Sequence, residues 1–141
     1  MRKRSTLESA EALPGASVPS ETAQITAGTL LGIQAVLIRP EEPFVLTSGR
    51  ASPVYVDCRR IISYPRARGQ LMDLAVKTLR DAAGVDAFDV VAGGETAGIP
   101  FAAWIAERLD LPMIYVRKKP KGFGRNAQIE GTFHELSLIH I

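Results

Sequence analysis

Five cations and no carboxylate lie within RKKPKGFGRN, residues 117–126. Such a cluster attracts anions more strongly than the same charges spread over a surface. Pro120, Gly122 and Gly124 keep the segment non-helical and hinged, as a lid that folds over a ligand must be. Lysines on such a lid can stabilise negative charge as it develops on a leaving group. The alternative is a basic loop that only faces solvent, and we favour anion binding.

A second candidate is AGGETAG, residues 92–98, which lies between an apolar strand pattern and a helical one. Glycines there let backbone N–H groups and the helix N-terminus approach a phosphate. The segment matches neither the dinucleotide fingerprint nor the Walker loop, and glycine in such turns often serves geometry alone. Glu95 argues against a bare phosphate cradle unless it faces a ribose hydroxyl or a metal.

The third candidate is FVLTSGRASPVYVDCRR, residues 44–60. Tyr55 can present a flat face to a planar ligand. Three arginines in the same stretch, Arg50, Arg59 and Arg60, can bind acidic groups. The turn residues also explain a plain hairpin, so this stretch alone does not decide between structure and binding.

Composition limits the possible classes of protein. The chain has 141 residues, 46% of them hydrophobic, and a net charge of +2, which is typical of one soluble globular domain. No apolar run reaches the roughly 18 residues that span a bilayer. Phe123 is the one aromatic residue within the basic segment, so a stacking platform for single-stranded nucleic acid is not indicated. The single cysteine, Cys58, excludes an internal disulfide, suits the cytoplasm, and is expected to be a small buried apolar group.

The first half of the chain predicts helices around a small β-rich flap. A helical pattern begins at Glu21 and runs to the prolines at 40 and 43. Residues 44–46 and 54–56 read as two short strands joined by the turn residues TSGRASP. A second helix follows Pro65 and stops at Gly84.

The second half predicts a strand–helix–strand unit. FDVVAGG is an apolar strand that runs into glycines, IPFAAWIAERL is a helix that starts near Pro100, and LPMIYV is another strand. This order is typical of a βαβ crossover, and the predicted fold class is α/β with a largely parallel sheet flanked by helices. We divide the chain into a mobile tail (1–20), a partial domain (21–135) and a terminal segment (136–141).

Taken in order, FVLTSGRASPVYVDCR, AGGETAGIPFA and YVRKKPKGFGRNAQIEG resemble orotate phosphoribosyltransferase. The first block matches the Phe-x-Leu-x-Ser-Gly-x-x-Ser-Pro signature of the family from Phe44 to Pro53. The third block resembles its mobile catalytic loop, with Arg117, Lys118 and Lys121 at the positions of the family's cations. The resemblance implies a type I phosphoribosyltransferase-like sheet with an N-terminal flap.

The implied reaction transfers phosphoribosyl from phosphoribosyl pyrophosphate to orotate, giving orotidine monophosphate and pyrophosphate in pyrimidine (UMP) biosynthesis. Lys121 and Arg117 would be catalytic, and Arg117, Lys118 and Lys121 would bind phosphoribosyl pyrophosphate in trans across a homodimer. Tyr55 would bind orotate. Mg²⁺ would bridge phosphate oxygens, and no residue of the chain is assigned as a metal ligand. No membrane or nucleic-acid partner is expected.

The chain also departs from the family pattern. Many members have lysine at the positions of Thr47 and Ala97, and the loop often carries histidine or tyrosine where this chain has Phe123. These changes suggest that other cations contact the pyrophosphate, namely Arg50, Lys119 or Arg125.

After Gly131 the chain lacks the acidic, Thr-Gly-rich turn that grips the ribose 5-phosphate in the family. We therefore expect a sheet truncated at its C-terminus and a chain that is inactive alone. Residues 136–141, LSLIHI, are expected to be a non-native tail encoded by a sequencing adapter, and the alternative is a genuine short strand. A non-enzymatic nucleotide- or RNA-binding protein on the same scaffold is the alternative function.

Overall fold

The computed structural model describes residues 20–84, 86–120, 122, 127–133 and 139–140. The tail over residues 1–19, the predicted catalytic Lys121, and Phe123 and Arg125 lie outside the described residues. Within the described parts the elements follow in the order α1 (Glu21–Gly32), β1 (Val36–Ile38), β2 (Phe44–Val45), β3 (Ala51–Ser52), β4 (Val54–Val56), η1 (Cys58–Ser63), α2 (Pro65–Ala83), β5 (Val90–Gly94), α3 (Gly98–Leu109), β6 (Met113–Val116), β7 (Ile129–Glu130) and β8 (Ile139–His140).

The larger sheet has the strand order β7-β6-β5-β8. Strands β5 and β6 are parallel, with Val91 opposite Met113 and Gly94 opposite Val116, and α3 forms the crossover between them. This confirms the predicted βαβ unit. Strand β7, which the sequence pattern did not predict, pairs antiparallel with β6 and makes the sheet mixed.

The C-terminal residues contribute a strand to the same sheet. Ile139 and His140 pair in parallel with Val90 and Val91 of β5. Their pairing agrees with the alternative of a short strand, while the non-native origin of residues 136–141 stays a prediction.

Helix α3 packs on one face of β5 through Val91, Ala102 and Ala106, all buried. Gly93 lies where the strand and helix approach most closely, because an added Cβ would stand 2.9 Å from the carbonyl oxygen of Gly98. On the other face of the strands, Ile114 is buried in a cluster with two residues of β5, Val90 and Ala92. The βαβ unit therefore has a dense core.

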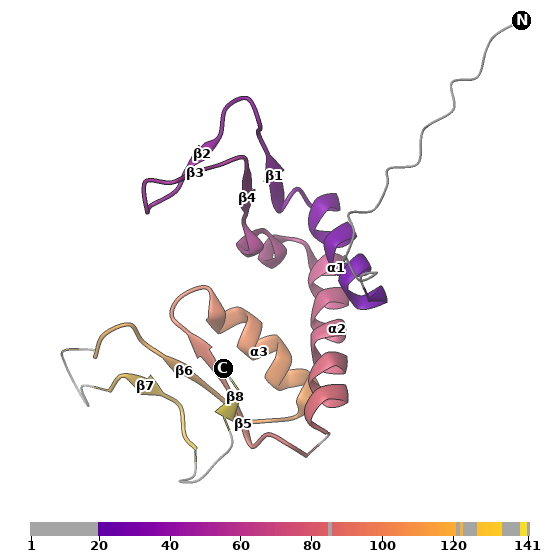
Figure 1. Cartoon of the computed structure of the whole chain (residues 1–141). Coiled ribbons are helices and arrows are strands. Elements are labelled where there is room, and N and C mark those ends of the chain that lie inside the picture. The colour runs from indigo at the N-terminus through magenta and orange to yellow at the C-terminus, as the bar shows by residue number, and fades with distance from the viewer. Residues whose placement is uncertain (1–19, 85, 121, 123–126, 134–138, 141) are drawn as a thin grey trace, which may run out of the picture.

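Helices α1 and α2 form the second packed region, beside α3 (Figure 1). Its buried residues are Ile33, Ala35, Ile61, Leu71 and Met72. Helix α2 begins at Pro65, as predicted, and is followed by Gly84 with a φ of 96°, a conformation that glycine adopts without strain. Among the described residues no helix is both long and apolar enough to cross a membrane.

The flap differs from the prediction in two ways. Helix α1 ends at Gly32, not near the prolines, because the N–H groups of Ile33 and Gln34 close its last turn and Val36–Ile38 is free to pair as strand β1. The two predicted strands also do not pair with each other. Strand β4 pairs with β1, and β2 pairs with β3, both antiparallel.

The expectation for Cys58 is wrong, because this cysteine is exposed. It opens the short 3₁₀ helix η1, whose buried residue is Ile61, so the apolar position of this turn lies three residues further on.

Candidate functional site

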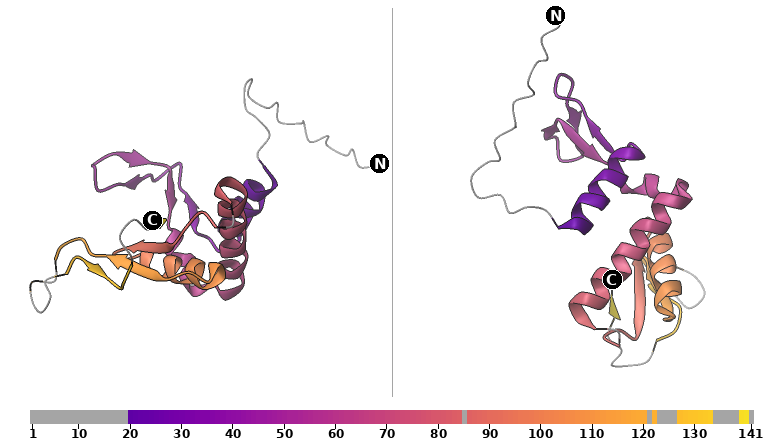
Figure 2. Two further views of the ribbon diagram at one scale, coloured as in Figure 1. Left: turned by 90° about the horizontal axis from the view of Figure 1, so that it is seen from below. Right: turned by 90° about the vertical axis from the view of Figure 1, so that its right-hand side faces the viewer.

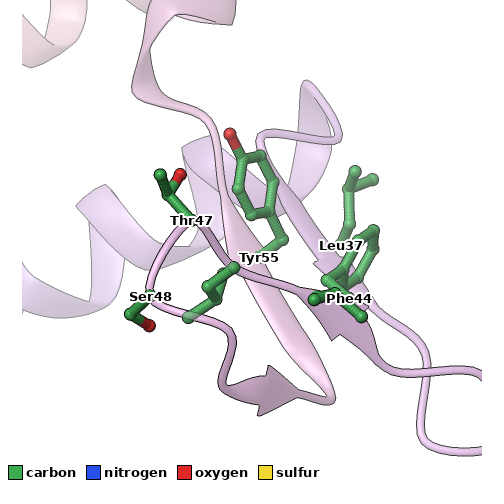
Figure 3. Close-up of a pocket in the computed structure, with 7 residues that line it drawn as sticks. Leu37, Phe44, Thr47, Ser48 and Tyr55 are labelled. Carbon is green, nitrogen blue, oxygen red and sulfur yellow. The ribbon is translucent and has the colours of Figure 1, made fainter.

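Residues of the flap line a pocket of about 570 Å³, and Tyr55, the predicted orotate-binding residue, is one of them (Figure 3). Its lining residues come from β1, β2, the following turn and β4: Leu37, Phe44, Val45, Leu46, Thr47, Ser48 and Tyr55. Apolar walls with hydroxyl groups from Thr47 and Ser48 suit a flat ligand that carries a few polar atoms. Thr47, one of the departures from the family pattern, thus lies in the pocket wall.

Two aromatic rings and a guanidinium are stacked in this flap. The rings of Phe44 and Tyr55 lie 5.5 Å apart and are tilted by 37°. The guanidinium of Arg39 lies 4.8 Å from the centroid of the Phe44 ring. Each contact adds stabilisation beyond area burial, so the flap holds its aromatic side chains although it has little core of its own. Arg39 was not identified from the sequence, because its contact with Phe44 has no sequence signature.

Asp57 fixes the arginine that reaches Tyr55. The guanidinium of Arg59 donates to Asp57 Oδ1 at 2.7 Å and to the Tyr55 hydroxyl at 3.5 Å. The hydrogen bond from Arg59 lowers the pKa of Asp57 below its usual value, and the same contact raises the pKa of Arg59. Arg59 is therefore a fixed cation beside the tyrosine hydroxyl.

Arg60, the third arginine of the predicted set, has a structural place. Its Nε donates to the carbonyl of Ile33 at 3.1 Å and a terminal nitrogen donates to the Tyr64 hydroxyl at 3.2 Å. The bond to Ile33 joins η1 to the end of α1, and the binding of acidic groups by Arg60 stays a prediction.

The second part of the candidate site is the turn between β5 and α3. Ala97 precedes the helix and gives no side-chain cap to its first turn, where the N–H of Ile99 donates to the carbonyl of Thr96 at 3.4 Å. The Glu95–Thr96 peptide bond in the turn is cis. Glu95 Oε2 accepts a hydrogen bond from the backbone N–H of Lys118 at 2.9 Å, so this side chain contacts the start of the basic segment.

The third part is the start of the basic segment after β6. The backbone N–H of Arg117 donates to the carbonyl of Gln128 at 2.8 Å, and Gln128 Nε2 donates to the carbonyl of Arg117 at 3.2 Å. The Nε of Arg117 is buried and has no hydrogen-bond partner in the described part of the chain. A buried donor without an acceptor is costly, and an anion would satisfy it. Lys118 and Lys119 are exposed.

The structure thus brings two of the three predicted stretches into direct contact. Parallel strands β5 and β6 end at one edge of the sheet, which is where α/β proteins bind ligands. Figure 1 shows strands β1 and β4 of the flap on the side toward which the carboxyl end of β5 points. The bond between Glu95 and Lys118, and the role of Gln128, were not predictable, because no local pattern marks pairs so far apart in sequence.

A resident metal site is not evident in the described residues, which contain no group of three or more His, Cys, Asp or Glu side chains able to hold an ion. Mg²⁺ often binds through one or two carboxylates together with substrate phosphates, and does not need a protein cage. Glu95 is a carboxylate at this edge of the sheet, and its Oε2 accepts a hydrogen bond from Lys118, so the binding of Mg²⁺ stays a prediction.

Comparisons with known proteins agree with this arrangement. No protein-family profile matches the chain. Over 116 residues the chain is 66% identical to an orotate phosphoribosyltransferase of Cereibacter sphaeroides, and the match covers 82% of this chain and 50% of that protein. Orotate phosphoribosyltransferase of Sinorhizobium medicae is 64% identical over 113 residues, which cover 80% of this chain and 49% of that protein. The chain therefore spans about half the length of the curated relatives it matches.

A solved structure shows the same fold. Orotate phosphoribosyltransferase from Aeropyrum pernix superposes with a TM-score of 0.61 at 37% identity, over 74% of this chain and 56% of that chain. The fold of the described part is accordingly that of the type I phosphoribosyltransferases. On its sequence and its fold, the matched segment is therefore similar to about half the length of orotate phosphoribosyltransferases.

Proposed function

We propose that this chain supplies the orotate pocket and the pyrophosphate-binding loop of an orotate phosphoribosyltransferase, a pentosyltransferase of pyrimidine (UMP) biosynthesis. The observation that carries the proposal is the 66% identity over 116 residues to a curated enzyme of that name. The pocket around Tyr55 and the buried, unpartnered Nε of Arg117 support it, because they offer a flat apolar site and an anion site.

In the proposed reaction, the bond from ribose C1 to a pyrophosphate oxygen breaks as a bond from C1 to an orotate nitrogen forms. Tyr55 holds the orotate ring by stacking, with Arg59 fixing its hydroxyl. Arg117 and Lys118 bind the pyrophosphate group, and Lys121 stabilises the negative charge that appears on it as it leaves. Mg²⁺, when bound with the substrate, neutralises phosphate charge.

The proposed function also includes an oligomeric state and a cellular compartment. The basic segment acts in the site of a second subunit, so the active form is a homodimer in which Lys121 works in trans. The protein works in the cytoplasm.

The direct test is a chimera in which residues 1–131 of this chain precede the remaining half of the Cereibacter sphaeroides relative. With orotate, phosphoribosyl pyrophosphate and Mg²⁺, the chimera is expected to form orotidine monophosphate, and its Lys121→Ala variant to lose about 10² to 10³ in kcat. Phosphoribosyl transfer to adenine in place of orotate is the specificity control. A folded, dimeric chimera without turnover would refute the proposal.

The alternative of a non-enzymatic nucleotide- or RNA-binding protein is not favoured, because the relatives over the matched segment are named as enzymes. Salt-sensitive RNA binding by the chimera that is lost in the Lys118→Ala variant would support the RNA-binding alternative.

A further inference from the structure

Glu95 joins the turn after β5 to the segment after β6 through two hydrogen bonds. Its backbone N–H donates to the carbonyl of Val116 at 2.8 Å, and its carboxylate accepts from the N–H of Lys118 at 2.9 Å. The first bond continues the parallel ladder one residue beyond the last register pair, Gly94 and Val116. The second bond uses the Glu95 side chain as the acceptor, because after Gly94 the backbone leaves β5 and leads to α3.

The basic segment is held on both sides where it leaves the sheet. Arg117 faces β7 with its backbone and exchanges bonds with Gln128. Lys118, the next residue, turns its N–H to the opposite side, as alternation along an extended chain requires. On that side the N–H of Lys118 donates to the carboxylate of Glu95. The Glu95 side chain thus holds the backbone of the basic segment next to the turn between β5 and α3.

We propose that Glu95 is a positioning residue that holds Arg117 and Lys118 in place for pyrophosphate. This rests on the proposed function and deepens it, because it names the group that sets the cation geometry. Glu95 touches the backbone of the basic segment and not the reacting atoms. Its negative charge also repels an anion among the cations, so its positioning effect and its charge act in opposite directions.

Two substitutions separate these effects. Glu95→Gln keeps a side-chain oxygen that can accept from Lys118 and removes the charge. Glu95→Ala removes both. Thr96→Ala, at an exposed neighbouring side chain of the same turn, is the matched control. Thermal unfolding of the 141-residue chain identifies any variant that is globally unfolded.

The first measurement is hydrogen exchange of the Lys118 amide, followed by NMR in the 141-residue chain. Glu95→Ala is expected to speed its exchange about tenfold, while Glu95→Gln and Thr96→Ala leave it within about threefold of the parent. Equal exchange in the parent and in Glu95→Ala would overturn the proposal.

The second measurement is the affinity for inorganic pyrophosphate by calorimetry. The Kd is expected to rise at least about fivefold from Glu95→Gln to Glu95→Ala, with the parent between them or equal to the Gln variant. Equal affinity in the Gln and Ala variants would overturn the positioning role. If the parent chain binds no pyrophosphate, the proposed pyrophosphate site fails in this chain, and the exchange measurement alone decides whether Glu95 holds the segment.

Discussion

The flap and the βαβ unit differ in how much of their apolar side chains is exposed to solvent. In the unit, Val90, Val91 and Ile114 are each 1% exposed, and Gly93 leaves no room for a methyl group against the helix. In the flap, Val45 is 79% and Ile38 63% exposed, and the strands pair only as two short ribbons (Figure 2). Short two-stranded ribbons are marginal alone. The flap around Tyr55 is therefore held by few contacts, whereas the sheet edge that carries Glu95 and Arg117 rests on a densely packed core.

The largest difference is expected from removing a core side chain. Ile114→Ala leaves a cavity between the strands and should lower the free energy of unfolding by about 3 kcal/mol. Val45→Ala, in the flap, should change it by less than about 0.5 kcal/mol. Denaturant unfolding of the 141-residue chain measures both changes. Similar decreases in the free energy of unfolding would show that the two regions do not differ in packing.

A smaller effect is expected at the strand–helix contact. A Cβ at position 93 would lie 2.9 Å from the Cβ of Ala102, so Gly93→Ala should destabilise the chain by about 2 kcal/mol. The matched control is Gly94→Ala, because a Cβ there would meet nothing within 4 Å. Equal melting temperatures for the two variants would show that β5 and α3 lie further apart than described.

The smallest effect is expected from acid titration in the flap. The folded pKa of Asp57 lies below its ordinary value of 3.8, so its bond to Arg59 contributes fully above that pH and is lost as the pH falls through the lower folded value. Resonances of the Tyr55 ring should therefore shift below about pH 4 in the parent and not in Asp57→Asn. A shift that persists in Asp57→Asn would assign the titration to another group.

The sequence predicted the elements whose signal is local. Helix α2 with its stop at Gly84 and the β5–α3–β6 unit follow from apolar periodicity and from glycine and proline positions. The partners of β1 and β7, by contrast, are set by pairing between distant segments, and no local pattern encodes them. The exposure of Cys58 was missed for the same reason, since burial depends on what packs against the residue.

In the candidate site, too, contiguous motifs were predictable from the sequence and contacts between distant residues were not. Tyr55 and Arg117 were found because their motifs are contiguous in sequence, and both lie in described parts of the site. The bond from Lys118 to Glu95 joins residues 23 apart, so only the fold reveals it. The roles of Tyr55, Arg117, Lys118, Lys121 and Mg²⁺ all stay predictions.

In the proposed function, the flap binds orotate and the basic segment binds pyrophosphate. Steady-state kinetics of the chimera with Tyr55→Ala and Arg117→Ala test it most directly. Tyr55→Ala is expected to raise the KM for orotate roughly tenfold and to leave the KM for phosphoribosyl pyrophosphate unchanged, and Arg117→Ala is expected to do the reverse. If both variants raise both constants equally, or neither changes either constant, the division of the site between the two regions is wrong.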